Sequence, residues 1–258
     1  MQKYDKGNNL SDFYSKSGCI RMEENKMNRI GIIGAMEIEV EALKEHMENV
    51  TRKTKASMEF HHGLLNGKEV VVVKSGIGKV NAAVCTQILV DDFQVDAVIN
   101  TGIAGSLKNE INIGDIVVST DTIQHDVDAR EFGYPKGQIP QMNVFSFVAN
   151  AQLRELAVDT CKKVNPEISV FEGRIVSGDQ FVASSEVKHE LIQEFSGFCT
   201  EMEGAAIAQA SYLNQIPFVI LRAISDKADN SAVMDYPTFE KKAAEHCVRL
   251  VEEMVKNI

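Results

Sequence analysis

The sequence predicts an α/β protein, a three-layer α/β/α sandwich around a central mixed, mostly parallel sheet. Short apolar runs rich in β-branched residues alternate with longer amphipathic stretches along most of the chain. Strands that alternate with helices are typical of a parallel sheet covered by helices on both faces. The 258 residues, 44% of them hydrophobic, are enough to bury the core of one domain.

Six apolar runs have the composition of buried strands. They are RIGIIG (29–34), EVVVVKS (69–75), DAVIN (96–100), DIVVST (115–120), SVFEGRIVS (169–177) and PFVILRAIS (217–225). Ligands of such sheets bind at the carboxyl ends of the strands, so residues that follow these runs are the first candidates for a site.

Two intervening stretches have helical periodicity. Residues 79–91 place Val80, Val84 and Ile88 four apart, and residues 237–256 open with Pro237 and carry their apolar side chains on one face. The Asn66-Gly67 pair predicts a hairpin turn. The longest irregular stretch is 124–145, and loops of that length are usually functional or disordered.

The domain organisation is simple. Residues 1–26 are polar with few apolar anchors, and they predict a disordered or loosely attached extension. Residues 27–258 then form a single domain. No repeat or low-complexity tract interrupts them.

Composition excludes several classes of function. The formal net charge of −10, without a basic stripe, disfavours binding to nucleic acid. Five scattered cysteines without a CxxC pair indicate reduced thiols in a cytoplasm. No apolar run approaches the roughly 20 residues of a membrane span, and the polar first residues lack the apolar segment of a signal peptide.

Acidic side chains follow the first predicted strand. Glu37, Glu39 and Glu41 come after the turn at Gly34, where acids complement a helix dipole. Taken alone, Glu39 is therefore either a dipole-complementing acid or a catalytic one. The segment GIIGAM lacks the GxGxxG spacing of a dinucleotide loop, which makes a cofactor site there a weak alternative.

Two stretches rich in small residues follow neighbouring strands. SGIGKVNAA (75–83) and NTGIAGSL (100–107) let main-chain N–H groups approach an anionic or hydroxyl-rich ligand. Each alone is equally well an ordinary turn from a strand to a helix. Together they favour a shared cleft.

Further acids end two other apolar segments. Glu201 and Glu203 stand two apart around Met202, and Asp226 ends the strand 217–225. Burial there would raise the pKa of Asp226, which suits a general acid. A capping aspartate is the alternative interpretation of Asp226 at this point. His125 and Asp126 lack partners at metal-ligand spacing, so a metal site is disfavoured and no cofactor is expected.

From about Met27 to the C-terminus the chain resembles the nucleoside phosphorylase/nucleosidase superfamily, and within it the 5′-methylthioadenosine/S-adenosylhomocysteine nucleosidases. The resemblance is carried by IGIIGAMEIEV (30–40), KSGIGKVNAA (74–83), CTEMEGAAIAQA (199–210) and VILRAISDKADN (219–230). It implies a nucleoside phosphorylase-like fold. In the implied reaction the N-glycosidic bond of either nucleoside is hydrolysed to adenine and a 5-thio-substituted ribose, in methionine salvage and S-adenosylhomocysteine recycling.

The resemblance also implies roles for individual residues. Glu39 is the general base that activates water, Asp226 is the general acid oriented by Ser225, and Glu203 binds the ribose hydroxyls. The implied substrate-binding residues are Ala35, Met36, Ile77, Phe181 with Val182 at the purine, Met202 at the ribose, and Tyr236. Tyr236 stands where a Phe is expected, and Ile103 stands where a Ser or Thr is expected.

The resemblance further implies a homodimer. Segment 124–145 reaches the neighbouring subunit's site, where Ala129, Phe132 and Pro140 cover the 5′-substituent. Two other functions stay open, a phosphate-dependent phosphorylase of the same fold and a non-catalytic nucleoside-binding protein. The absence of arginine between Arg52 and Arg130 favours water over phosphate. The order of preference among methylthioadenosine, S-adenosylhomocysteine, 5′-deoxyadenosine and aminodeoxyfutalosine stays open.

Overall fold

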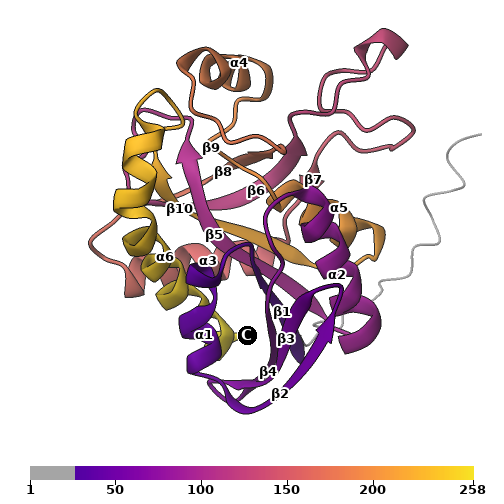
Figure 1. The fold of residues 1–258 in the computed structure, drawn as a ribbon, viewed down its shortest axis with the longest axis vertical. Helices are drawn as coiled ribbons and strands as arrows, with labels where there is room; N and C mark the ends of the chain where they lie inside the picture. Colours follow the sequence, from indigo (N-terminus) through magenta and orange to yellow (C-terminus); the bar gives the residue numbers. More distant parts are fainter. Residues whose placement is uncertain (1–26) are drawn as a thin grey trace, which may run out of the picture.

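The computed structural model describes residues 27–258, which form a ten-stranded mixed sheet flanked by helices (Figure 1). The predicted extension 1–26 lies outside the described residues. The strands are β1 (Arg29–Gly34), β2 (Glu48–Lys55), β3 (Met58–Leu65), β4 (Lys68–Lys74), β5 (Ala97–Ser106), β6 (Ile116–Gln124), β7 (Phe147–Val148), β8 (Val170–Ser177), β9 (Cys199–Glu201) and β10 (Phe218–Asp226). The helices are η1 (Glu37–Glu39), α1 (Glu41–Glu45), α2 (Lys79–Phe93), η2 (Arg130–Phe132), α3 (Ala151–Val164), α4 (Ser185–Phe195), α5 (Gly204–Leu213) and α6 (Ala232–Asn257).

The strand pairings close part of the sheet into a ring. β5 pairs with β10, β10 with β6, β6 with β8, β8 with β9, and β9 again with β5. β1 extends the sheet from β5 in parallel, and β4 follows β1 in parallel. β2 and β3 add an antiparallel hairpin edge. The sheet is mixed as predicted. Within the ring, the pairings of β10 with β6 and of β5 with β9 are antiparallel.

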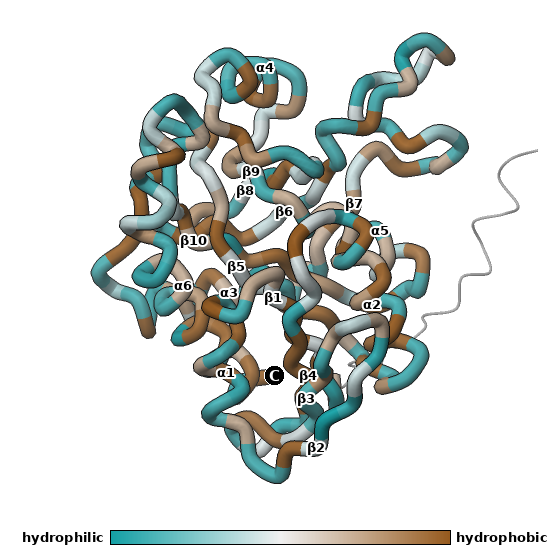
Figure 2. Tube along the Cα trace, viewed as in Figure 1, coloured by the Kyte–Doolittle hydropathy of each residue, from teal (hydrophilic) through white to brown (hydrophobic). Residues whose placement is uncertain are grey.

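Strand alternation divides the core between the two faces of the sheet. In β4, Val70 and Val72 pack with α3 and α6, whereas Val71 and Val73 pack with α2 and α5. Figure 2 shows hydrophobic residues concentrated along the central strands and polar residues along the outer turns. Helices therefore cover both faces, which confirms the three-layer prediction.

Several predicted elements differ in extent. β5 continues to Ser106, so the stretch 100–107 is mostly strand rather than a loop after a strand. It stays extended because β10 pairs with it as far as Gly105 and β9 pairs with it at Gly105 and Ser106. α6 begins at Ala232, and Pro237 lies inside it rather than at its start. Sequence reasoning missed β2, β3 and the three helices α3, α4 and α5.

Other local predictions hold. Asn66 and Gly67 join β3 to β4 with φ of 52° and 78°, the left-handed conformations of a tight hairpin turn. Segment 124–145 contains only the short η2 beyond the end of β6. None of the helices within residues 27–258 is long and apolar enough to cross a membrane.

Candidate active site

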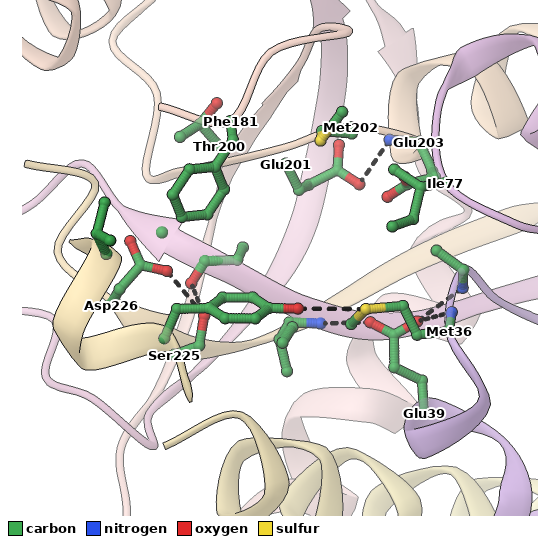
Figure 3. Close-up of a pocket in the computed structure, with 16 residues that line it drawn as sticks. Met36, Glu39, Ile77, Phe181, Thr200, Glu201, Met202, Glu203, Ser225 and Asp226 are labelled. Atoms are coloured by element: carbon green, nitrogen blue, oxygen red, sulfur yellow. Dashed lines mark hydrogen bonds between the residues drawn. The ribbon is translucent and has the colours of Figure 1, made fainter. Parts of the chain in front are cut away.

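A cavity of about 480 Å³ opens where β1, β5, β9 and β10 end (Figure 3). These are the carboxyl ends of strands, where ligands of parallel sheets bind. The lining residues are Ala35, Met36, Glu39, Ile77, Ile103, Ala104, Gly105, Phe181, Thr200, Glu201, Met202, Glu203, Ser225, Asp226, Val233 and Tyr236.

The cavity gathers most of the residues that the sequence nominated. Ala35, Met36, Glu39, Ile77, Phe181, Met202, Glu203, Ser225, Asp226 and Tyr236 all line it. Val182 does not line the cavity. It packs in a cluster with Leu191 and Ala228. Ala129, Phe132 and Pro140 lie on the long segment and do not line their own chain's cavity. Phe132 is 82% exposed.

Other lining residues were given no individual role by the sequence. Ile103, Ala104 and Gly105 belong to the stretch 100–107 that was predicted to border a cleft, and they line the cavity because β5 continues past Asn100. No sequence pattern indicated Val233. It lines the cavity because α6 begins at Ala232, before the predicted helix start at Pro237.

Glu39 is held by main-chain donors from two elements. Its Oε2 accepts hydrogen bonds from the N–H groups of Ala35 (2.6 Å) and Met36 (2.9 Å), and its Oε1 accepts one from Ile103 (3.2 Å). The side chain is almost fully buried. Burial raises the pKa of Glu39, while Arg222 and the N–H donors act in the opposite direction. The result is an oriented carboxyl group with a raised pKa.

Asp226 ends β10 on a different side of the cavity (Figure 3). Its Oδ1 accepts a hydrogen bond from the Ala228 N–H (2.8 Å), and its Oδ2 accepts one from the Ser225 hydroxyl (2.9 Å). Burial raises the pKa of Asp226, and the nearby carboxylates of Asp235 and Asp229 raise it further. A carboxyl group in this state is suited to holding a proton.

Glu203, directly before α5, is the third of the predicted acids that line the cavity. Its Oε1 accepts a hydrogen bond from the Gly78 N–H (2.8 Å), which joins this acid to the SGIGK stretch. Gly78 has a φ of 97°, a conformation that L side chains rarely adopt. Burial and the charge of Glu201 raise the pKa of Glu203 to about 8.

A buried ion pair lies behind these acids. The Arg222 guanidinium donates to Glu201 Oε2 and to the side-chain oxygen Oδ1 of Asn100 (2.6 Å). The amide of Asn100 in turn donates to the Ile33 carbonyl (2.8 Å). Hydrogen bonds therefore engage Glu201. The Arg222 guanidinium is a fixed positive charge close to Glu39, Glu201 and Glu203.

An apolar wall faces the acids. The rings of Phe181 and Tyr236 meet edge to face with centroids 5.8 Å apart. The Tyr236 hydroxyl donates to Met36 Sδ at 3.2 Å. Phe181 is half exposed at the mouth of the cavity, and so an aromatic face is available to a planar ligand.

Within residues 27–258, no group of three or more histidine, cysteine, aspartate or glutamate side chains is placed to hold a metal ion.

The sequence and the fold match one superfamily. Residues 29–256 match the family model described as the phosphorylase superfamily. The chain is 44% identical over 233 residues to the 5′-methylthioadenosine/S-adenosylhomocysteine nucleosidase of Chromohalobacter salexigens, covering 90% of this chain and 98% of that one.

Two solved structures are similarly close. The nucleosidase of the same name from Neisseria meningitidis, in complex with methylthio-immucillin-A, has a TM-score of 0.87 and 43% identity, covering 90% of this chain and all of that chain. The one from Colwellia psychrerythraea, in complex with adenine, has a TM-score of 0.86 and 40% identity, covering 89% and 95%. The chain belongs to the phosphorylase superfamily. Within it, the chain belongs to the family of 5′-methylthioadenosine/S-adenosylhomocysteine nucleosidases.

Proposed function

We infer that this chain hydrolyses the N-glycosidic bond of 5′-methylthioadenosine and S-adenosylhomocysteine, releasing adenine and a 5-thio-substituted ribose. Family membership supports the reaction, and the solved structures of two relatives contain methylthio-immucillin-A or adenine. The observation that carries the inference is the pair of buried carboxyl groups, Glu39 and Asp226, in separate parts of one cavity.

Cleavage of this bond places positive charge on the ribose and negative charge on the purine. A catalyst must therefore stabilise both ends. Asp226, with its raised pKa, donates a proton to the purine so that the base leaves neutral. Glu39 takes the proton of the attacking water, and Arg222 helps to keep this acid ionised. Glu203 accepts hydrogen bonds from the ribose hydroxyls.

The remaining lining residues follow from these roles. Phe181 stacks on the purine, and Ser225 orients Asp226. The main chain of Val182, which is not itself a lining residue, meets the edge of the base in this proposal. Met202 lies against the ribose. Ala35, Met36 and Ile77 complete the wall, and Tyr236 closes the end that receives the 5′-substituent.

Water is favoured over phosphate as the nucleophile. Among residues 27–258 no arginine lines the cavity, and Arg222, which lies behind the acids, is already engaged by Glu201 and Asn100. A phosphorylase needs free cationic or N–H donors for the phosphate group. A non-catalytic nucleoside-binding protein would not need acids with raised pKa values next to its ligand.

Product analysis tests this function. Adenine release from methylthioadenosine is expected at the same rate with and without phosphate, yielding methylthioribose. If turnover requires phosphate and yields a ribose 1-phosphate, the phosphorylase alternative is correct. Binding of methylthioadenosine without any turnover would favour the binding protein.

The active form is proposed to be a homodimer. Ala129, Phe132 and Pro140 do not line their own cavity, and the exposed Phe132 is free to cover the 5′-substituent in a neighbouring subunit. Exposed apolar side chains on α2, α5 and β7 favour contact with a second copy; they are Val80, Val84, Val148, Tyr212 and Leu213. Sedimentation velocity tests the assembly, and a fully active monomer would exclude the shared site.

The cellular setting follows from the reaction. Removal of methylthioadenosine and S-adenosylhomocysteine belongs to methionine salvage and S-adenosylhomocysteine recycling. The cytoplasm is the proposed compartment, supported by Cys85, Cys161, Cys199 and Cys247, which are buried free thiols. Residues 27–258 are proposed to act as a single nucleosidase domain, consistent with the match to residues 29–256.

A further inference from the structure

Lys188 is a buried lysine near Asp226 that the mechanism above does not use. It lies on α4 and is only 7% exposed, although lysine side chains are rarely buried without a partner. Its ammonium donates a hydrogen bond to the main-chain oxygen of Lys227 at 2.6 Å, and it lies 3.7 Å from Asp229 Oδ2. Both partners belong to the turn that follows Asp226.

A single peptide unit connects the Lys188 ammonium to the Asp226 carboxyl group. The oxygen of the peptide between Lys227 and Ala228 accepts from Lys188. The N–H of the same peptide belongs to Ala228 and donates to Asp226 Oδ1 at 2.8 Å. A positive charge at the oxygen of a peptide strengthens its N–H as a donor, because hydrogen bonds in a chain polarise one another. The Lys188 charge therefore acts on Asp226 through this peptide.

The turn needs support because its backbone is strained. Ala228 has a φ of 51°, in the left-handed region that disfavours residues with a Cβ, and it is fully buried. Such a conformation persists only where the surroundings hold it. A second hydrogen bond joins α4 to the turn: the Ser185 N–H donates to Asn230 Oδ1 at 3.4 Å.

The same helix is joined to the purine end of the cavity. α4 follows directly after the segment that carries Phe181, and Val182 packs in one cluster with Leu191 of α4 and Ala228 of the turn. A shift of α4 relative to the turn would therefore change the position of Asp226 relative to the aromatic face. Lys188 is the charged contact that fixes these two segments together.

We propose that Lys188 is a positioning residue that fixes the Lys227–Ala228 peptide and thereby directs the Asp226 proton toward the leaving base. The proposal rests on the proposed hydrolase function, and it concerns the step in which the leaving group is protonated. Lys188 does not touch the substrate in this proposal.

The charges around Asp226 predict the sign of a pH effect. Asp229 lies in the same turn, Asp235 and Tyr236 lie on α6, and Lys188 is the positive charge contributed by α4. Without the positive charge of Lys188, the negative charges of Asp229 and Asp235 act on Asp226 without this opposing charge. The Ala228 N–H also becomes a weaker hydrogen-bond donor. The pKa of Asp226 then rises, and the upper pH limit of kcat moves upward with it.

The test compares Lys188→Met, which keeps the length of the side chain, with Lys188→Arg, which keeps its charge. Lys163→Met is the control, since Lys163 pairs with Glu253 on the surface at 2.8 Å, outside the set of residues that line the cavity. Each variant is assayed with methylthioadenosine across pH. Each is also assayed with 4-nitrophenyl 5-methylthio-β-ribofuranoside, whose leaving group needs no proton.

For methylthioadenosine, Lys188→Met is expected to lower kcat about tenfold, to change KM by less than about threefold, and to move the upper pH limit upward. Turnover of the nitrophenyl substrate should stay within about twofold of wild type, because no protonation is needed. Lys188→Arg should recover most of the loss, and Lys163→Met should behave as wild type.

Two results would overturn the proposal. Equal losses with both substrates would mean that Lys188 only supports the fold, and unchanged kcat and pH profile in Lys188→Met would mean that it has no role in protonation. Failure of the hydrolase function itself looks different, because the wild-type protein would then release no adenine in the same assay.

Discussion

Gly102 on β5 lies directly against the carboxyl group of Glu39. A Cβ built on Gly102 would lie 2.6 Å from Glu39 Oε1 and 3.2 Å from the Arg222 guanidinium. The next residue, Ile103, donates its N–H to the same oxygen. The absence of a side chain at position 102 is therefore what allows β5 to hold the proposed base.

Gly102→Ala is expected to displace Glu39 and to lower kcat by about a hundredfold, the scale on which misplacement by about 1 Å affects a catalytic group. The matched control is Gly31→Ala, whose Cβ would meet the flexible end of Leu89 at 3.0 Å and the methyl groups of Val95 at 3.5 Å, an ordinary contact. That variant should lose some thermal stability and keep its kcat. Equal kcat values for Gly102→Ala and wild type would show that Glu39 does not need this contact.

Asp226→Asn and Glu39→Gln should each lower kcat by orders of magnitude while substrate still binds. Each substitution removes a proton transfer that occurs only in the transition state, so the rate changes more than ground-state binding. Single-turnover adenine release, paired with calorimetric binding of an unreactive methylthioadenosine analogue, separates the two effects. A near-wild-type rate in either variant would remove the catalytic role given to that residue.

Glu203→Gln should weaken ribose binding as well as the rate. The amide replaces one acceptor oxygen with a donor, which cannot accept from a ribose hydroxyl. The substituted amide retains one oxygen for the Gly78 N–H, so the contact between α5 and the SGIGK stretch can persist. A 2′-deoxy substrate provides the comparison: if wild type processes it as well as the ribonucleoside, Glu203 does not bind the 2′-hydroxyl.

The raised pKa of Asp226 also predicts a pH-dependent difference in stability. An acid whose pKa is higher in the folded than in the unfolded protein contributes stability below its unfolded pKa, and that contribution is lost as pH rises through the folded pKa. Asn cannot ionise, and its oxygen can still accept from Ala228.

Asp226→Asn should therefore melt at a higher temperature than wild type at pH 8, with a smaller difference at pH 5. One pKa unit corresponds to about 1.4 kcal/mol, or roughly 3–6 °C in a chain of this size. Thermal unfolding followed by circular dichroism at both pH values is the measurement. A gain in melting temperature that is the same at pH 5 and pH 8 would mean that ionisation of Asp226 is not its cause.

Parts of the fold and the site could be predicted locally. Each apolar run that was predicted as a strand is one, because a strand buried on both faces carries a continuous apolar pattern. The Asn66-Gly67 turn follows from the preference of these residues for positive φ. The acids Glu39, Glu203 and Asp226 could be nominated because they follow such runs, where strand ends meet.

The exposed hairpin strand β2 escaped prediction because its side chains are mostly polar and exposed, which leaves no periodic pattern. The length of β5 also escaped prediction, because its small residues 102–106 are kept extended by pairing with β10 and β9, which are more than ninety residues away. Local composition in that stretch indicates a turn.

The sequence by itself indicated the six apolar strands, the hairpin turn and the three acids, because each depends on neighbours within a few positions. Tertiary structure alone decided that β5, β10, β6, β8 and β9 close into a ring and that Arg222 is shared between Glu201 and Asn100. It also decided that Lys188 reaches the peptide bonded to Asp226. The physical reason is that strand register and buried polar pairing join residues far apart in the chain, and no local pattern encodes which distant donor a buried carboxyl group will meet.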